Sequence, residues 1–212
     1  MLPQGFPNER EIALNIISPR YQPGTVKINP SALRLQTELI NGTNTYTFNP
    51  NTNQKLTRPE KGLGVNDHFF AHSLGLFLLY EEATKKGSGD LMTYELNEGQ
   101  GAVYNGTTSV QINQVKFIDE LDNRRFRKVP ESQGAYDTST REYNQASYED
   151  GLVQLPEILI FKGDLNNEIS VTIPTWSGQD MAAGLGTTRK CYLVMLASGL
   201  YVSGAVGKEL TK

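Results

Sequence analysis

The chain contains few of the residues on which common kinds of functional site depend. Its 212 residues include one cysteine, Cys191, and two histidines, His68 and His72. A single cysteine excludes an internal disulfide framework and a cysteine-based zinc cluster. Two histidines leave little for a catalytic triad or a metal centre. Twenty basic side chains against 23 acidic ones give a net charge of -3, so the charge balance does not indicate a nucleic-acid partner.

Long apolar segments are also missing. The longest apolar runs, Leu74–Tyr80 and Tyr192–Ala197, are much shorter than the ~20 residues that span a bilayer. The first residues, Met1–Pro7, lack the basic flank and apolar stretch of a signal peptide. We therefore expect the glycosylation sequons at Asn41 and Asn105 to serve as Asn-Gly turns.

What the sequence does contain is a period of two between apolar residues, which is typical of β-strands. Ile12–Ile17 alternates in this way and predicts a strand that ends at Pro19. Leu33–Leu39 alternates as well, and Asn41-Gly42 precedes a further alternating pair, Tyr46 and Phe48. The Asn-Gly turn between the two runs predicts a β-hairpin.

The middle of the chain is harder to interpret. Asp67–Glu82 fits either a helix or a strand that is buried on both faces, and we favour the strand because Gly75 would fall inside the helix. A loop then leads to a strand through Met92 and Leu96. In Thr108–Asp119 the apolar parity changes, and a β-bulge near Asn113-Gln114 would restore one apolar face.

The last third of the chain gives the clearest strands. Ile158–Phe161, Ile169–Ile173 and Cys191–Val202 are apolar or alternating, and Gly199 marks a bulge or a close approach of two backbones. In all we count about ten strands separated by turn residues, which predicts an all-β sandwich or barrel.

Candidate chemical groups are sparse. His68 and His72 lie four residues apart and share a face on a helix or a strand, but no third ligand is nearby, so buried and hydrogen-bonded imidazoles are the preferred interpretation over a metal site. Cys191 lies in an apolar strand and is expected to be an inert thiol. Gly199–Gly204 has the glycine spacing of a phosphate-binding loop, but the lysine and the serine or threonine that must follow the second glycine are absent. We therefore expect no catalytic residue, cofactor or metal.

The concentrated basic feature is a cluster that contains Arg124, Arg125 and Arg127. Forked guanidinium groups can hold phosphate or carboxylate groups. However, acidic residues stand immediately upstream, within 119–122, and nearly cancel this charge. This balance of local charge favours a surface hairpin with internal ion pairs, or a contact with another subunit, over a nucleic-acid binding site.

A long polar stretch, 131–151, carries Tyr136, Tyr143 and Tyr148 among serine, threonine, glutamine and asparagine. Tyrosines in such surroundings are typical of interfaces and of sugar-binding surfaces. An ordinary surface loop with locally packed tyrosines explains them as well. The three tyrosines and the three arginines together form the candidate subunit interface.

Six segments form a pattern of strands and turns between roughly Asp67 and Val202. They are Asn66–Phe70, Leu74–Tyr80, Asp119–Phe126, Leu159–Phe161, Asn167–Pro174 and Tyr192–Val202. This pattern resembles the jelly-roll capsid proteins of tailless, lipid-containing icosahedral bacteriophages that infect Bacteroidetes hosts. The resemblance implies a jelly-roll β-sandwich, either a single jelly roll over residues 1–212 or a compact double jelly roll divided into 1–120 and 121–212. A double jelly roll needs about sixteen strands.

The resemblance also implies a function. It predicts a capsid protein, not an enzyme, that forms homotrimers and an icosahedral shell with other capsid proteins. Such a protein is made in the host cytoplasm and resides in the virion, close to an internal viral membrane and without specific nucleic-acid binding. The alternative is a carbohydrate-binding or host-recognition β-sandwich module, such as a phage spike.

Overall fold

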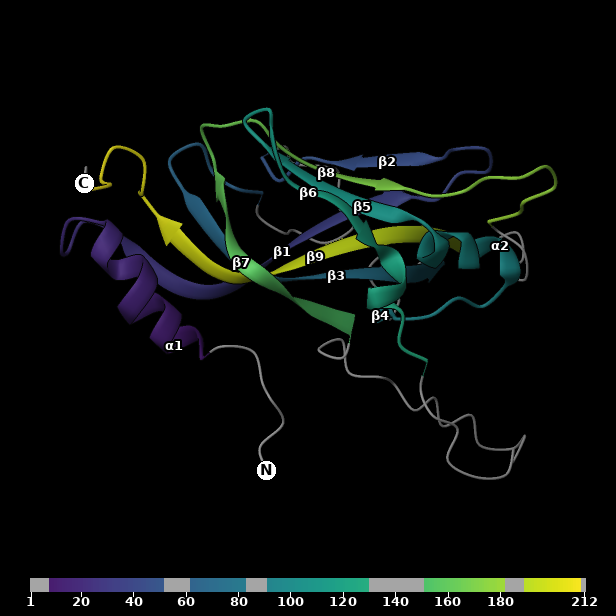
Figure 1. Cartoon of the computed structure of the whole chain (residues 1–212), viewed down its shortest axis with the longest axis horizontal. Helices are drawn as coiled ribbons and strands as arrows, with labels where there is room; N and C mark the ends of the chain where they lie inside the picture. Colours follow the sequence, from purple (N-terminus) through teal and green to yellow (C-terminus); the bar gives the residue numbers. More distant parts are fainter. Residues whose placement is uncertain (1–7, 52–61, 83–90, 130–150, 182–188, 211–212) are drawn as a thin grey trace, which may run out of the picture.

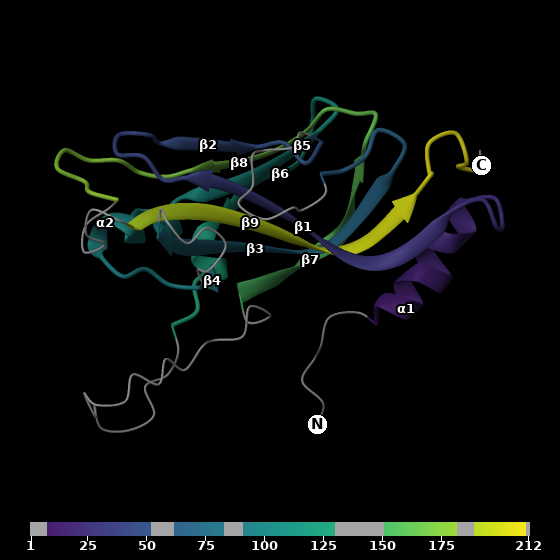
Figure 2. The same cartoon turned by 180° about the vertical axis from the view of Figure 1, so that it is seen from behind.

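Two antiparallel β-sheets pack face to face in the computed structural model, which describes residues 8–51, 62–82, 91–129, 151–181 and 189–210 (Figures 1 and 2). The large sheet has the order β1-β9-β3, with β7 and the short β4 both paired to β3. The small sheet has the order β2-β8-β5-β6. The all-β sandwich predicted from the alternating residues is thus confirmed.

The strands have the following bounds. In the large sheet they are β1 Lys27–Glu38, β3 His68–Glu82, β4 Leu91–Met92, β7 Leu152–Lys162 and β9 Arg189–Ser203. In the small sheet they are β2 Thr45–Phe48, β5 Thr107–Ile112, β6 Val115–Asp122 and β8 Asn167–Thr172. The helical turns are α1 Glu9–Glu11, η1 Ile12–Ile17, η2 Ser18–Arg20, α2 Glu98–Gly101, η3 Ala102–Asn105 and η4 Asn123–Phe126.

The pairing of the strands is nested. β1 pairs with β9, β2 with β8, β3 with β7 and β5 with β6, and these pairs fall alternately in the large and the small sheet. The contacts of β9 with β3 and of β8 with β5 complete the two four-stranded sets. This winding is that of an eight-stranded jelly roll. Strands from before and after residue 120 lie together in both sheets, so the described residues form one jelly roll.

The main core lies between the two sheets. The small sheet contributes alternate residues, such as Val110 of β5 and Ile169 of β8, which are both fully buried. The strands β3 and β9 are buried on both faces. Behind the large sheet, a second apolar cluster surrounds Phe70 and a third surrounds Phe77.

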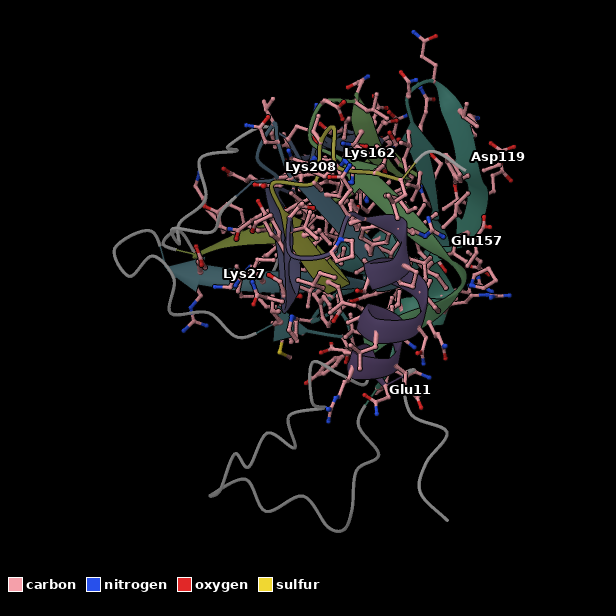
Figure 3. The ribbon with its side chains drawn as sticks, turned by 90° about the vertical axis from the view of Figure 1, so that its left-hand side faces the viewer. Glu11, Lys27, Asp119, Glu157, Lys162 and Lys208 are labelled. Atoms are coloured by element: carbon pink, nitrogen blue, oxygen red, sulfur yellow. The ribbon has the colours of Figure 1, made fainter. Side chains whose placement is uncertain are left out.

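The predicted strand at Ile12–Ile17 is wrong, because this segment is helical. Asn8 caps the first turn, where its side-chain oxygen accepts a hydrogen bond from the Arg10 backbone N–H at 3.0 Å. Ile12 and Ile17 are buried against the large sheet around Phe70. The helical segment 9–20 therefore covers one end of the outer face of that sheet (Figure 3), where Glu11 lies low on the helix and Lys162 and Lys208 lie above it.

Two predicted turns have different roles from those expected. The hairpin at Asn41-Gly42 is wrong, because β1 and β2 lie in different sheets and this turn carries the chain from one to the other. The β5–β6 register does shift close to the predicted bulge, between Val110 and Gln111, but no bulge lies at Asn113-Gln114 itself. These residues form the tight turn between β5 and β6, with positive φ angles of 47° and 68°.

The favoured strand over Asp67–Glu82 is confirmed as β3, and the close approach at Gly199 is confirmed as well. Gly199 of β9 stands opposite Ala71, and a Cβ atom at this position would overlap the backbone carbonyl of Phe70. The pairing register of β3 shifts between Ala71 and Ser73, so His72 is an extra residue in the strand. Within the described residues, no helix is long and apolar enough to cross a membrane.

Candidate functional site

The structure describes three of the six residues predicted to form a subunit interface. Arg124, Arg125 and Arg127 lie in or directly after the 3₁₀ turn η4, at the end of β6. The three tyrosines, Tyr136, Tyr143 and Tyr148, lie outside the described residues. Their role in an interface therefore remains a prediction.

The arginine turn is anchored in the core, which differs from the predicted surface hairpin. Asp122 caps η4 through a hydrogen bond that its side chain accepts from the Arg124 backbone N–H at 2.9 Å. Phe126 is fully buried in the main core. Asn123 is buried too, where it accepts a hydrogen bond from the Thr108 hydroxyl at 2.6 Å and donates one to the Val103 carbonyl at 2.8 Å. These contacts fix where the flanking arginines emerge.

Beside this turn lies a cavity of about 360 Å³, which we call the arginine pocket. Its described lining comes from the segment around α2 and η3 and from the arginine turn: Glu95, Glu98, Gly101, Tyr104, Asn105, Arg124 and Arg127. α2 lies at the opposite end of the sandwich from the helical segment 9–20 (Figures 1 and 2).

One ion pair forms a wall of the pocket. Arg127 holds the carboxylate of Glu95 with two nitrogens, Nε at 2.8 Å from Oε2 and Nη2 in contact with Oε1. This fork lowers the pKa of Glu95 below its usual value and raises that of Arg127. Sequence reasoning expected the nearby acids of β6 to neutralise the arginines. Instead, Asp119 pairs with Lys116 at 2.7 Å, and Glu95 from a distant segment neutralises Arg127.

The second arginine of the pocket keeps a net positive charge. Arg124 donates from Nε and Nη2 to the amide oxygen of Asn105 at 3.4 and 3.2 Å, which is a neutral partner. Glu98 is exposed at the rim, and the described residues give it no ion-pair partner. Arg125 is exposed and does not line the pocket. The structure thus brings two of the three predicted arginines into one site and leaves the third outside it.

The two histidines lie at the other end of the molecule, beneath the helical segment. The Tyr21 hydroxyl and His68 Nδ1 form a buried hydrogen bond of 2.7 Å, and Glu209 Oε1 lies 3.6 Å from the same nitrogen. His72 Nδ1 lies 3.2 Å from the Ser73 hydroxyl, and its Nε2 lies 3.6 Å from Glu9 Oε1. We call these residues the histidine clamp, because they join both ends of the described chain to β3.

The clamp explains the electrostatics of both imidazoles. Burial lowers the pKa of His68 and of His72, and the carboxylates of Glu209 and Glu9 oppose that effect. Within the described residues, no group of three histidine, cysteine or acidic side chains could hold a metal ion. The arrangement is therefore that of buried, hydrogen-bonded histidines that face carboxylates.

The remaining candidates occupy the interior of the large sheet. Cys191 is buried in β9, and burial raises the pKa of its thiol to about 12, so the thiolate form is scarce at neutral pH. The first five residues of Gly199–Gly204 belong to β9. This segment is thus a strand and not a loop around a phosphate.

Sequence reasoning missed the acidic side of the arginine pocket. It predicted a strand through Met92 and Leu96, but the strand ends at Met92. Asn97 then caps α2, where its side-chain oxygen accepts a hydrogen bond from the Gln100 backbone N–H at 2.9 Å. Asn97 followed by Glu98 is the usual signal for the start of a helix, and it could have placed Glu98 at a helical turn.

Searches against protein-family models, curated protein sequences and solved structures found no match for this chain.

Proposed function

We propose that this chain is a structural protein that self-assembles, namely the capsid protein of an icosahedral phage shell. The observation that carries the proposal is the nested pairing of the eight-stranded jelly roll. Jelly rolls are common in viral capsid domains, although lectins and cupins use them too. The exposed edge of the sandwich therefore provides a second, independent support.

The edge strand β6 presents apolar side chains to the surface. Val115 and Phe117 are 58% and 48% exposed, and Lys116 and Asp119 are exposed among them. Figure 3 shows Asp119 on β6 and Lys27 on β1 at opposite sides of the molecule. An apolar strip with a charged border suits a contact that identical copies repeat by symmetry.

The arginine turn directly follows β6 in the chain, so the candidate interface of Arg124, Arg125 and Arg127 continues this edge. In the proposed assembly, the chain forms trimers that contact each other and further capsid proteins, and it resides in the virion beside an internal membrane. No enzymatic activity or specific nucleic-acid contact belongs to the proposal.

Size-exclusion chromatography with multi-angle light scattering tests the proposal. We expect the purified chain to form trimers or larger particles, and we expect Phe117→Asp to shift them towards the monomer while the circular dichroism spectrum is unchanged. The matched control is Leu14→Asp, which changes a similarly exposed apolar residue of the helical segment, 57% exposed, at the other end of the molecule. A wild-type chain that stays monomeric at high micromolar concentration contradicts the proposal.

The alternative function is a carbohydrate-binding or host-recognition module. The arginine pocket is the observation that favours it, because its lining offers both hydrogen-bond donors and acceptors at the surface. A monomer that binds glycans would support this alternative over the shell.

A further inference from the structure

We propose that the arginine pocket binds one neutral sugar residue of a surface glycan, held mainly by Arg124, Asn105 and Glu98. The inference rests on the alternative function given above, and it names the site and the chemical class of its ligand. It applies to the unassembled chain, because the proposed shell would place the pocket residues Arg124 and Arg127 in a subunit contact.

The pocket is rigid before any ligand arrives. Phe126 anchors one wall in the core. Two hydrogen bonds between Lys128 and Thr93 hold the chain that follows. The Lys128 N–H donates to the Thr93 carbonyl at 3.0 Å, and the Thr93 hydroxyl donates to the Lys128 carbonyl at 2.5 Å. The ion pair of Arg127 with Glu95 ties this wall to the opposite one. A pre-formed cavity of this kind loses little conformational entropy on binding.

The charges of the pocket select against an ionic ligand. Two arginines and two glutamates line it, so their formal charges cancel. An anionic ligand that approaches Arg124 also meets the carboxylates of Glu95 and Glu98, and a cationic ligand meets the two guanidinium groups. A nucleotide or an acidic peptide is therefore disfavoured, while a neutral polar molecule is repelled by neither set.

The groups left over by the internal bonds match neighbouring hydroxyl groups. Arg124 uses Nε and Nη2 on Asn105 and retains further guanidinium N–H groups. The Asn105 amide contributes an N–H₂ donor, and the exposed Glu98 carboxylate contributes an acceptor. A sugar hydroxyl can accept a hydrogen bond from Arg124 or Asn105 and can donate one to the Glu98 carboxylate. Two adjacent hydroxyl groups therefore satisfy the donors and the acceptor together. Hydrogen bonds to charged groups are the stronger ones.

Gly101 leaves the space that the ring requires. A Cβ atom at this position would lie 3.5 Å from Glu95 Cγ, an ordinary van der Waals contact, in a helical backbone with φ of -59°. Alanine is therefore compatible with the fold here and narrows the cavity. This gives a variant that changes the shape of the pocket without removing any of its polar groups.

The test is saturation-transfer difference NMR on the purified full chain with a panel of monosaccharide probes. The neutral probes are the methyl glycosides of glucose, galactose, mannose and N-acetylglucosamine; the charged ones are glucuronate and glucosamine. We expect at least one neutral probe to bind with a Kd in the millimolar range and the charged probes to bind several-fold more weakly. Arg124→Ala is expected to raise the Kd of the tightest-binding probe ~10-fold, and Gly101→Ala is expected to raise it several-fold.

The matched control is Arg125→Ala, which removes the neighbouring exposed arginine of the same turn and should leave the Kd unchanged. No binding by any neutral probe overturns the inference, as does tighter binding of a charged probe or a Kd unaffected by Arg124→Ala. Light scattering of the same samples without sugar reports assembly separately. A failure of sugar binding is thus distinguished from a failure of the shell proposal.

Discussion

The two sheets of the jelly roll differ in how they meet their surroundings. The long strands β3 and β9 of the large sheet are buried on both faces, with Phe77 and Val194 fully buried on the outer side. The short strands of the small sheet alternate, as in β2, where Tyr46 and Phe48 are buried and Thr45 and Thr47 are exposed. The central strands of the large sheet thus lie in the interior, and the small sheet forms part of the surface.

The difference follows from what covers each outer face. The helical segment 9–20 packs Ile12 and Ile17 onto one end of the large sheet around Phe70. Among the described residues no helix packs in this way on the small sheet. Continuous apolar runs such as Leu74–Tyr80 therefore belong to the covered sheet, and alternating runs such as Ile169–Ile173 to the open one. The residue pattern thus distinguishes the central strands β3 and β9 from the small sheet, whereas β1 at the edge of the large sheet alternates as well.

The largest expected effect tests whether the outer face of the large sheet is a true core. Phe77→Ala should lower the free energy of unfolding by about 3–5 kcal/mol, because a fully buried aromatic ring is removed from the outer cluster. Leu76→Ala, on the inner face of the same strand, should cost about 2–5 kcal/mol. Urea unfolding followed by circular dichroism measures both. A loss of under ~1 kcal/mol for Phe77→Ala would contradict the two-faced burial.

The second effect concerns the histidine clamp beneath the covering helix. Burial lowers the pKa of His68 and His72 from the usual imidazole value of about 6.5, so the unfolded chain binds protons more readily than the folded one. The contribution of the two histidines to the free energy of unfolding is therefore fully present above about pH 6.5. It is lost as the pH decreases through the lower pKa values of the folded state. Glu209 and Glu9 oppose the lowering, and Lys162 adds to it at His68.

Urea unfolding at several pH values between 7.5 and about 5.5, above the range in which most carboxylates titrate, measures this dependence. The double variant His68→Gln/His72→Gln should be less stable at pH 7.5 and should show a flatter pH dependence. An unchanged slope in the double variant would assign the pH dependence to other groups.

The third effect is a gain in the small sheet. Gln114 adopts a φ of 68° in the turn between β5 and β6, a conformation that costs a side chain free energy and suits glycine. Gln114→Gly should raise the free energy of unfolding by about 0.5–1 kcal/mol. Thermal unfolding provides the measurement. A destabilised Gln114→Gly variant would argue against this turn conformation.

The smallest effect tests the exposed face of the small sheet. Thr47 lies on the edge strand β2 with its side chain exposed, so Thr47→Ala should change the free energy of unfolding by no more than ~0.5 kcal/mol. Urea unfolding followed by circular dichroism, as for Phe77→Ala, measures this change. A loss as large as that of Leu76→Ala would mean that this face is covered in the same way as the large sheet.

Most of the sandwich could be predicted from the sequence, because strand burial follows local alternation. The failures lie where pairing is non-local. Asn41-Gly42 has the composition of a hairpin turn, but tertiary packing sends β2 to β8 and not to β1. Ile12 and Ile17 read as part of a strand, while the capped turn at Asn8 and contact with Phe70 make the segment helical.

The candidate site was predictable only in part for the same reason. Arg124 and Arg127 stood out as a local cluster, but their partners Asn105 and Glu95 come from segments 19 and 32 residues earlier. No spacing rule connects those segments. Tyr136, Tyr143 and Tyr148 fall outside the described residues, so their contribution to an interface stays a prediction.

The central position of β9 has a consequence for the order in which the chain folds. β9 lies between β1 and β3 along most of its length, and during synthesis it leaves the ribosome after the other described strands. β1 and β3 can therefore pair with β9 only late in synthesis. The β5–β6 hairpin closes through a two-residue turn and can form early. The large sheet assembles only after translation has passed residue 203, and folding dominated by such distant pairings is slow.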